Sequence, residues 1–517
     1  MFDLVYLGHA GWSIKHNDFR CLIDPWFGPQ GAFLGQWYPF PQNYHLFTDS
    51  LLDDLDFIYI SHAHEDHYDK WLLEKVDKAV PIYIADFADK TLRDGLMTLG
   101  FETVIEVRDE EAIELKNITI KIFKEEDSLD SDSCIVLNDG KNQILNLNDC
   151  HIEFSKLKTL EDAVDLLLIQ TSSAIWWPCV YSYDTEEMRH HGRFKRESNL
   201  TRAAHYAKYI NAKMTIPNAG PPYFNDESME LWNYNKHKDW NPFVSSDDAV
   251  KYLQDCNRAS ELVIPGSTIC LSGADIRVKT NEKEKEAIYG DIDNYTELFK
   301  ERLREYALPK ERATKVEIDS VVENFSTQLK RIKRVSNFYV DQIKIPVLFD
   351  FGQEGKWVAD FTQESPLRPY NGESVGYTFI LDPNSVALLF REKAIDFERY
   401  FLGCNFSCSR EPDVYNHFLF ALLKNFDTKR LLASEKIYVG RNRDVLDQTF
   451  IYKHESRTFE IQKYCPHMLA DLEEIGFVNA ENEFVCPLHG WKFDLDSGQS
   501  INRKGECMKI REVVEKQ

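Results

Sequence analysis

The chain has 517 residues, which is too long for one ordinary hydrophobic core, so we expect two to four domains. Its formal net charge of −24 disfavours binding to nucleic acid or to an anionic membrane, because the overall field repels phosphate groups. We expect no membrane span and no signal peptide, because no apolar run is long enough and the N-terminus lacks a charged region before an apolar one. The 11 cysteines are scattered and do not form a secreted disulfide framework, which favours a reducing cytoplasm.

The first 278 residues alternate short β-type runs with loops and helical stretches, as "LTRAAHYAKYI" (200–210) illustrates. We expect them to form an α/β sandwich with polar side chains gathered at strand ends, where active sites are often built. The predicted strands share one pattern, a buried apolar run that ends in polar residues. They lie at residues 3–8, 19–24, 57–62, 81–86, 118–123, 143–149 and 165–170.

Residues 61–67 read "SHAHEDH" and place three histidines and an aspartate at metal-binding spacing. The pattern resembles metallo-β-lactamase-fold hydrolases, and the alternative is a set of solvated loop histidines. In that family the first two histidines bind one metal, the Asp–His pair binds a second, and a later aspartate bridges the two. The resemblance implies a metallo-β-lactamase-like sandwich in which Asp66, His67 and Asp149 also carry the catalysis. The implied metal ligands are His62, His64, Asp66, His67 and Asp149.

Other parts of the family pattern are altered in this chain. Residues 68–150 contain no histidine where the family has a third one, so we expect Asp127, or Glu126, to replace it. Asn218 stands where the family has its last histidine. Oxygen-rich ligand sets suit iron or manganese better than zinc, so we expect one or two non-haem iron ions, with zinc or manganese less favoured. Asp24, in "CLIDPWF", matches an early element of the phosphodiesterase and lactonase branch.

Two segments of different character follow the first 278 residues. Residues 279–336 are highly charged and helical in period, which predicts a helical connector that either docks or acts as a spacer. Residues 337–428 combine strands and helices in an α+β module whose element order resembles sterol-carrier-like domains. Strands are predicted there at 338–351 and 376–382, and helices at 385–403 and 414–426.

The C-terminal segment, residues 429–517, is rich in predicted strands and contains "CPH" and "CPLHGW". Eighteen residues separate the two halves, which supply Cys465, His467, Cys486 and His489. This spacing resembles the Rieske [2Fe–2S] motif, in which two thiolates bind one iron and two imidazoles bind the other. Structural zinc is the alternative, because two cysteines and two histidines also suit tetrahedral zinc. The proline after each cysteine and the following "GWKFDLDSG" favour an all-β Rieske domain.

The residues around the two cluster loops indicate which kind of Rieske centre is present. High-potential respiratory versions carry an extra cysteine in each loop and a hydroxyl residue after the glycine. This chain has Met468, Leu488 and Trp491 at those places. Loss of a hydroxyl that hydrogen-bonds to cluster sulfur lowers the potential, which predicts a ferredoxin- or oxygenase-type centre that passes one electron at a time.

The two metal motifs together resemble the CMP-N-acetylneuraminate hydroxylase family, which joins a Rieske domain to a metallo-β-lactamase-like domain. Local similarity includes "LNDC" (147–150) and "PNAGPPYF" (217–224), although in that family the Rieske domain comes first. The resemblance implies an iron-dependent Rieske-type monooxygenase that uses O₂ and takes electrons from a reductase or a ferredoxin- or cytochrome-like donor. Its substrate is expected to be small and anionic, such as a nucleotide sugar or a biosynthetic intermediate.

Two other functions remain open at this point. One is a phosphodiesterase- or lactonase-type metallo-hydrolase with a redox-sensing Rieske domain, and the other is an electron carrier with a degenerate N-terminal site. Hydrolysis consumes no electrons, which favours the oxygenase. The basic stretch 189–197 predicts a site for a phosphate or carboxylate, or else a solvated surface. The aromatic loop 26–47 predicts an active-site lid, or else an ordinary packed loop.

Overall fold

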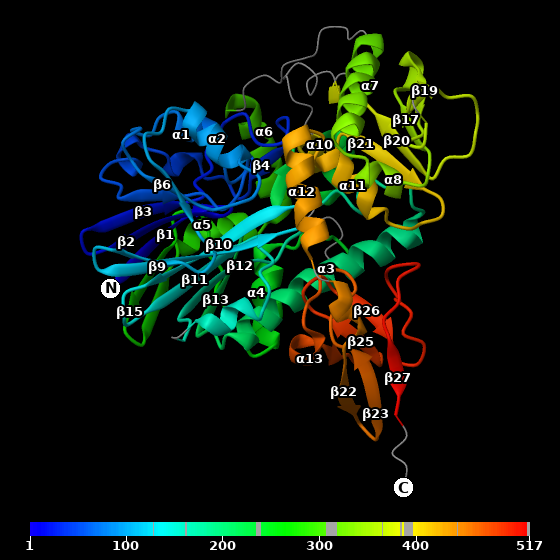
Figure 1. Ribbon diagram of the computed structural model, residues 1–517. Coiled ribbons are helices and arrows are strands. Elements are labelled where there is room, and N and C mark those ends of the chain that lie inside the picture. The colour runs from blue at the N-terminus through cyan, green and yellow to red at the C-terminus, as the bar shows by residue number, and fades with distance from the viewer. Residues whose placement is uncertain are drawn as a thin grey trace.

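The computed structural model is divided in chain order into an N-terminal sandwich, a middle module and a C-terminal β-rich part (Figure 1). None of the described helices is both long enough and apolar enough to cross a membrane. The described residues are 1–127, 129–160, 163–233, 239–306, 318–363, 365–382, 385–386, 397–441 and 443–513.

Two packed sheets form the sandwich, with a shared core that draws apolar side chains from both. The eight-stranded sheet has the order β16-β15-β1-β2-β3-β5-β6-β7. Its strands are β1 (Phe2–Gly8), β2 (Gly11–His16), β3 (Phe19–Ile23), β5 (Phe57–Tyr59), β6 (Ile82–Ala85), β7 (Val104–Val107), β15 (Thr268–Ser272) and β16 (Asp275–Lys279).

The six-stranded sheet has the order β13-β12-β11-β10-β9-β8, and a separate ribbon pairs β4 (Trp37–Pro39) with β14 (Pro222–Phe224). Strands β3 and β5 run parallel, as do β11, β12 and β13, so the carboxyl ends of strands within each set lie at one edge. The six strands are β8 (Ala112–Leu115), β9 (Ile118–Glu126), β10 (Ser131–Asn138), β11 (Gln143–Asn148), β12 (Leu166–Gln170) and β13 (Met214–Asn218). The predicted sandwich is thus confirmed.

Helix α3 (Thr185–Tyr209) is the longest element of the sandwich and begins at a capping box formed by Asp184 and Glu187. The helix predicted at 200–210 therefore starts earlier than expected, and the basic stretch 189–197 lies within it. At Gly192 a Cβ atom would lie 2.3 Å from the Trp240 carbonyl oxygen, so glycine permits the close packing of α3. The other helices here are α1 (Lys70–Leu73), α2 (Thr91–Thr98) and α4 (Ser246–Asp255).

The charged segment after the sandwich contains helices α5 (Glu282–Tyr289), α6 (Ile292–Tyr306) and α7 (Ile318–Val335). Phe299 of α6 packs in one cluster with Tyr38 and Tyr223 of the sandwich. Helix α7 instead contributes buried side chains to the core of the middle module. The segment therefore docks on both neighbours and is not a free spacer.

The middle module is a five-stranded sheet of order β19-β18-β17-β20-β21 covered by helices. The strand predicted at 338–351 is wrong in its first part, which forms α8, whereas the strand predicted at 376–382 is confirmed. Most of the helix predicted at 385–403 lies outside the described residues. The elements are α8 (Phe338–Gln342), β17 (Val347–Asp350), β18 (Lys356–Ala359), β19 (Leu367–Pro369), β20 (Tyr377–Leu381), α10 (Phe397–Leu402), β21 (Phe406–Arg410), α11 (His417–Lys424) and α12 (Thr428–Gly440).

The C-terminal part has two three-stranded sheets, as expected for the predicted β-rich domain. Figure 1 shows α3 running between this part and the yellow-orange middle module. Gly490 packs directly on α3, because a Cβ atom there would lie 2.2 Å from Ser198 Oγ. The elements are β22 (Thr449–His454), β23 (Arg457–Gln462), α13 (Leu472–Ile475), β24 (Phe477–Val478), β25 (Glu483–Cys486), β26 (Trp491–Asp494) and β27 (Ile510–Glu512).

Candidate functional site

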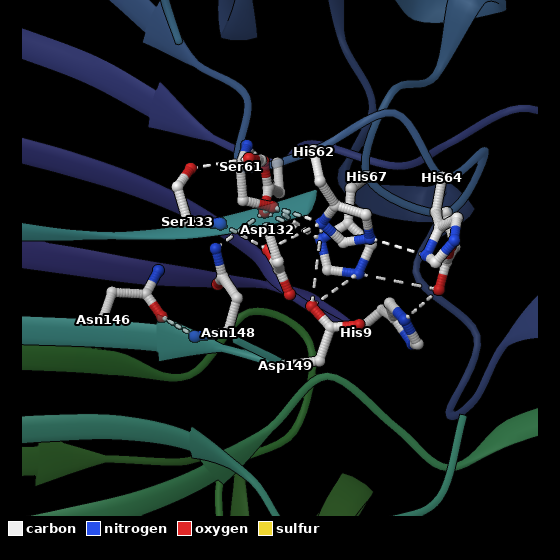
Figure 2. A network of polar contacts seen from close by, with 12 residues as sticks. His9, Ser61, His62, His64, His67, Asp132, Ser133, Asn146, Asn148 and Asp149 are labelled. Atoms are coloured by element: carbon white, nitrogen blue, oxygen red, sulfur yellow. Dashed lines mark hydrogen bonds and ion pairs between the residues drawn. The ribbon is translucent and has the colours of Figure 1, made fainter. Parts of the chain in front are cut away.

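The predicted metal-binding residues come together at the strand-end edge of the sandwich. The "SHAHEDH" loop follows β5, and Asp149 directly follows β11 of the other sheet. Figure 2 shows the His62 and His67 rings side by side above the Asp149 carboxylate, with His64 to one side. The two sheets thus bring His62 and Asp149 together although they lie 87 positions apart in the sequence.

The first group of potential ligands contains His62, His64 and Asp149, whose ligand atoms all lie within 4.8 Å of one another. The Nε2 atom of His62 lies 2.7 Å from Nδ1 of His64. Two imidazoles and one carboxylate are the donor set of the facial-triad sites that hold non-haem iron(II) and leave positions open. The structure therefore offers an iron-type site without a third histidine.

The second group contains His9, Asp66 and His67, again two imidazoles and one carboxylate. His9 was missed by the sequence reasoning, although a histidine directly after a predicted strand was a usable signal. His67 Nδ1 donates a hydrogen bond to Asp24 Oδ2 at 2.8 Å, which turns Nε2 toward Asp149 Oδ1 at 3.4 Å. Asp24, matched earlier to a family element, thus orients a ligand from outside the group.

Several ligand-type atoms in the two groups are buried without a hydrogen-bond partner, namely His67 Nε2, Asp66 Oδ1 and Asp149 Oδ1. Burial would lower the pKa of His67, but Asp149, followed by Asp66 and Asp24, raises it to about 9. The carboxylates therefore create a local field that attracts positive charge. Buried ligand atoms without a hydrogen-bond partner, placed in such a field, fit bound metal cations, because leaving these atoms unpaired is costly.

Asp127 and Asn218, the two predicted replacements, are not brought into either group. Asp127 Oδ1 accepts the backbone N–H of Asp130 at 2.8 Å and so closes the turn between β9 and β10. Asp132 lies closer, with its Oδ1 atom 3.1 Å from Nδ1 of His62. Asn218 lies beside Asn146, 3.4 Å from its side-chain oxygen. The sequence could not select Asp132, because several acidic residues surround this turn.

The middle module supports the first group through a buried carboxylate. Glu398 of α10 accepts a hydrogen bond from His64 Nε2 at 3.1 Å. The same carboxylate pairs with Lys424 at 2.8 Å and with Arg430 at 3.1 Å. Burial alone would raise the pKa of Glu398, but Lys424 and His64 hold it well below its usual value. An ionised Glu398 fixes the His64 ring so that Nδ1 faces the metal site.

The four predicted cluster ligands converge at the tip of the C-terminal part. Cys465 and Cys486 are each 1% exposed, and the rings of His467 and His489 lie 4.7 Å apart between centroids. His467 Nδ1 is buried with no hydrogen-bond partner, and the Trp491 ring stacks on this imidazole. Burial lowers the pKa of both histidines well below the usual value, which keeps the imidazoles neutral. These residues fit the two-thiolate, two-imidazole donor set of a Rieske cluster.

A cavity of about 590 Å³ lies between the two candidate sites. One end is lined by His62, His64 and Asp149 of the sandwich. The opposite end is lined by His467 and His489. Its walls come from all three parts of the chain and include Lys195, Trp177, Arg410, Tyr415 and Arg503.

The wall near the cluster end carries positive charge that protein carboxylates do not balance. Lys195 and Arg503 line the cavity, and among the described residues neither forms an ion pair with a carboxylate, although Asp413 and Glu506 line the same cavity. Arg503 lies over the rings of Trp177 and Trp491, at 5.3 and 5.9 Å from their centroids. Burial, followed by nearby arginines, lowers the pKa of Lys195 to about 7. An anionic guest would relieve this excess charge.

The structure also separates the alternatives for the two predicted substrate elements. Within the basic stretch 189–197, Lys195 faces the cavity, whereas Arg193 forms an exposed ion pair with an aspartate. The stretch is thus divided between the cavity wall and an exposed surface, and anion binding by it stays a prediction. In the aromatic loop, Trp37 is 1% exposed and forms part of a core cluster, and no residue of 26–47 lines the cavity. The segment 26–47 is therefore an ordinary packed loop and not a lid over this cavity.

Comparisons with known protein families match three regions of the chain. A beta-lactamase superfamily domain matches residues 3–192. An Rv3818-like, SCP2-like domain matches residues 321–440. A Rieske [2Fe-2S] domain matches residues 430–511.

The chain is similar along most of its length to a Rieske iron–sulfur protein and to a hydroxylase, and along about half of its length to a solved hydroxylase structure. The Rieske 2Fe-2S iron-sulfur protein Rv3818 of Mycobacterium tuberculosis is 28% identical over 522 residues, covering 97% of this chain and 98% of that protein. The cytidine monophosphate-N-acetylneuraminic acid hydroxylase of Danio rerio is 21% identical over 460 residues, covering 80% and 70%. CmlA, a diiron beta-hydroxylase from Streptomyces venezuelae, is 16% identical with a TM-score of 0.34, covering 54% of each chain.

The matched regions agree with the observed parts of the structure. The Rieske match contains the four converging cluster residues. The superfamily match contains all six residues of the two His–Asp groups. The chain is therefore a Rieske-type iron–sulfur oxidoreductase that joins a β-lactamase-superfamily domain to a C-terminal Rieske domain, and it resembles the CMP-N-acetylneuraminate hydroxylase family.

Proposed function

We propose that this protein is an iron-dependent oxygenase that hydroxylates a small anionic molecule inside the cavity between the two candidate sites. The observation that carries the proposal is that one cavity reaches both the His62–His64–Asp149 group and the cluster histidines. A molecule bound there lies next to both centres at once. A hydrolase has no use for this arrangement, because hydrolysis consumes no electrons.

The bound groups supply the redox chemistry that protein side chains lack. When present, the Rieske cluster delivers single electrons and non-haem iron activates dioxygen. The electrons have to come from outside the chain, and a reductase or a ferredoxin- or cytochrome-like protein is the proposed donor. The 11 cysteines are all unpaired, which supports a cytoplasmic setting for this exchange.

The residues of the chain bind and orient the substrate. Lys195 and Arg503 are placed to hold a phosphate or carboxylate at the cluster end of the cavity. The Trp177 ring, beneath the Arg503 guanidinium, gives an apolar wall for the rest of the molecule. Enclosure by three parts of the chain limits access of water to the oxidised carbon.

We propose a nucleotide sugar resembling CMP-N-acetylneuraminate, or an anionic biosynthetic intermediate, as the substrate. The similarity to the hydroxylase of Danio rerio supports the first choice. The unbalanced cations at Lys195 and Arg503 support an anion of either kind. The similarity assigns no residue of this chain to sugar binding.

Oxygen uptake by the reconstituted full-length protein tests this function. We expect oxygen consumption that requires both a reductant and an anionic substrate, with CMP-N-acetylneuraminate as the first candidate. A His62→Ala, His64→Ala double variant should lose this activity and keep the cluster's visible absorption. Cleavage of phosphodiester or lactone substrates without reductant would instead support a metallo-hydrolase and overturn the proposal.

A further inference from the structure

His151 lies between the two candidate cofactor sites and belongs to neither. It follows the metal-site residue Asp149 by two positions, just beyond β11. Its ring lies 5.5 Å from the ring of the cluster residue His489, at an interplanar angle of 62°. The three residues Asp149, Cys150 and His151 therefore form a short covalent path from the metal site to the edge of the cluster site.

This contact is the one ring contact that joins a cluster residue to the N-terminal sandwich, among the residues that the structure describes. The second cluster histidine, His467, contacts only His489 and Trp491 through its ring. Trp491 leads on to Arg503 and the cavity wall. The shortest ring-and-backbone route from the cluster to Asp149 therefore passes through His151.

The path is fixed in place by the surrounding core. Cys150 is 2% exposed and packs in the same cluster as Cys465 and Cys486, and its N–H bonds to the Leu147 carbonyl at 2.9 Å. On the other side of His151, the carbonyl of Ile152 accepts a hydrogen bond from the hydroxyl of Tyr206 in α3. The buried neighbours Cys150 and Ile152 thus anchor His151 on both sides, next to His489.

Packing alone does not explain an imidazole at this position. His151 forms a side-chain hydrogen bond with Gln170, but its Nε2 atom is buried with no partner, and the side chain lines the cavity beside His489. A leucine would fill the same space without leaving a buried nitrogen unpaired. The imidazole therefore places an aromatic ring with a free nitrogen beside the cluster histidine, which an aliphatic side chain does not provide.

We propose that His151 is the contact through which electrons pass from the Rieske cluster to the metal held by Asp149. The proposal rests on the oxygenase function and adds the route that joins its two centres. With both groups bound, His489 would hold the cluster and Asp149 the iron, and the ring contact with His151 and the Asp149–His151 backbone would carry one electron from the reduced cluster to a ferric ion. No bond forms or breaks at His151, and an external reductase-type donor restores the electron to the cluster.

Cluster reoxidation in the full-length protein tests the route. The loaded, fully reduced protein is mixed with air-saturated buffer, and the visible absorption of the cluster is followed by stopped flow. We expect His151→Leu, which removes the ring contact, to slow reoxidation by about tenfold or more, a loss typical of changes just outside the metal ligands. The cluster's reduction potential and electron paramagnetic resonance spectrum should stay as in the wild type, which a structural role of His151 does not predict.

A matched control is offered by His205 of α3, whose ring stacks on Phe477 of the Rieske domain at 4.5 Å. His205→Leu removes a similar ring contact between the same domains but lies off the route, so its reoxidation rate should not change. Wild-type reoxidation in His151→Leu would overturn the proposal. Equal slowing in His205→Leu would also overturn it, because the effect would then come from loosened docking.

Two further variants keep the result interpretable. If His151→Leu loses the cluster, His151→Asn is measured in the same way, and loss of the cluster from both shows that His151 holds the cluster and refutes the route. The double variant His62→Ala, His64→Ala reports on the oxygenase function itself. If that variant reoxidises as fast as the wild type, the function fails. A slow double variant with a fast His151→Leu refutes the route alone.

Discussion

Replacement of Glu398 tests whether the middle module controls metal binding in the sandwich. Glu398→Gln preserves the size of the side chain but removes the charge that holds His64 Nε2 at 3.1 Å. Both cations beside it keep another carboxylate, because Lys424 also pairs with Asp130 and Arg430 also pairs with Asp89. The variant should therefore fold, and the loss should fall mainly on the orientation of His64.

The expected size of the effect follows from the role of the hydrogen bond. Residues that orient metal ligands typically change metal affinity by about 10–100-fold when replaced. That range equals about 1.4–2.7 kcal/mol, which agrees with the ~1.5–3 kcal/mol usual for hydrogen bonds to charged groups. We expect Glu398→Gln near the lower bound and Glu398→Ala near the upper bound, because alanine removes the acceptor altogether.

Anaerobic titration with iron(II) against a competing chelator measures the affinity of the N-terminal site. Glu435→Gln is the matched control, because Glu435 lies in the same module and accepts a hydrogen bond from Ser336 at 2.6 Å. Its change should leave iron affinity unaltered. Unchanged iron affinity in both Glu398 variants would show that Glu398 does not orient His64 for metal binding. Equal weakening in the control would point to general damage to the module.

Three further predictions concern the cavity and the domain contacts. Lys195, with a pKa of about 7, is charged below that pH, so sulfate binding measured by calorimetry should weaken several-fold from about pH 6 to about pH 8. Lys195→Met should abolish this dependence, and a pH-independent wild type would contradict it. Asp132→Asn should lower the iron content of the N-terminal site and Asp127→Asn should not, because of these two aspartates only Asp132 contacts a ligand imidazole. If metal analysis shows iron loss in Asp127→Asn but not in Asp132→Asn, Asp127 is the ligand instead. Gly490→Ala combines a φ of 70° with a clash against Ser198, so it should lower the melting temperature and cluster content, and Ser198→Gly should restore part of both.

Much of the fold could be predicted from the sequence because local patterns decide it. Apolar runs ending in polar residues gave the sandwich strands, and Cys–Pro loops gave the Rieske part. The first part of the strand predicted at 338–351 failed, because the apolar stretch "FYVDQI" begins with the short helix α8, whose Tyr339 and Val340 enter the module core. Short apolar runs do not distinguish a helix from a strand, so tertiary packing decides.

The candidate site was predictable where ligands are close together in the sequence and, for Asp149, where a family resemblance implied a ligand after a strand. The loop from His62 to His67 and the Cys–His pairs form local motifs, and they converge in the structure. His9, Asp132 and Glu398 come from separate elements, and only the packing of the sheets and the middle module brings them to the site. No spacing rule links such residues along the chain.

Metal analysis of full-length protein purified without air tests the iron-dependent oxygenase most directly. We expect the two irons of the cluster and one or two more, with the additional iron lost in the His62→Ala, His64→Ala variant and the cluster retained. We also expect reductant-dependent oxygen consumption only in the protein that holds the additional iron. Two irons accompanied by zinc in the N-terminal site would contradict the oxygenase and favour a hydrolase.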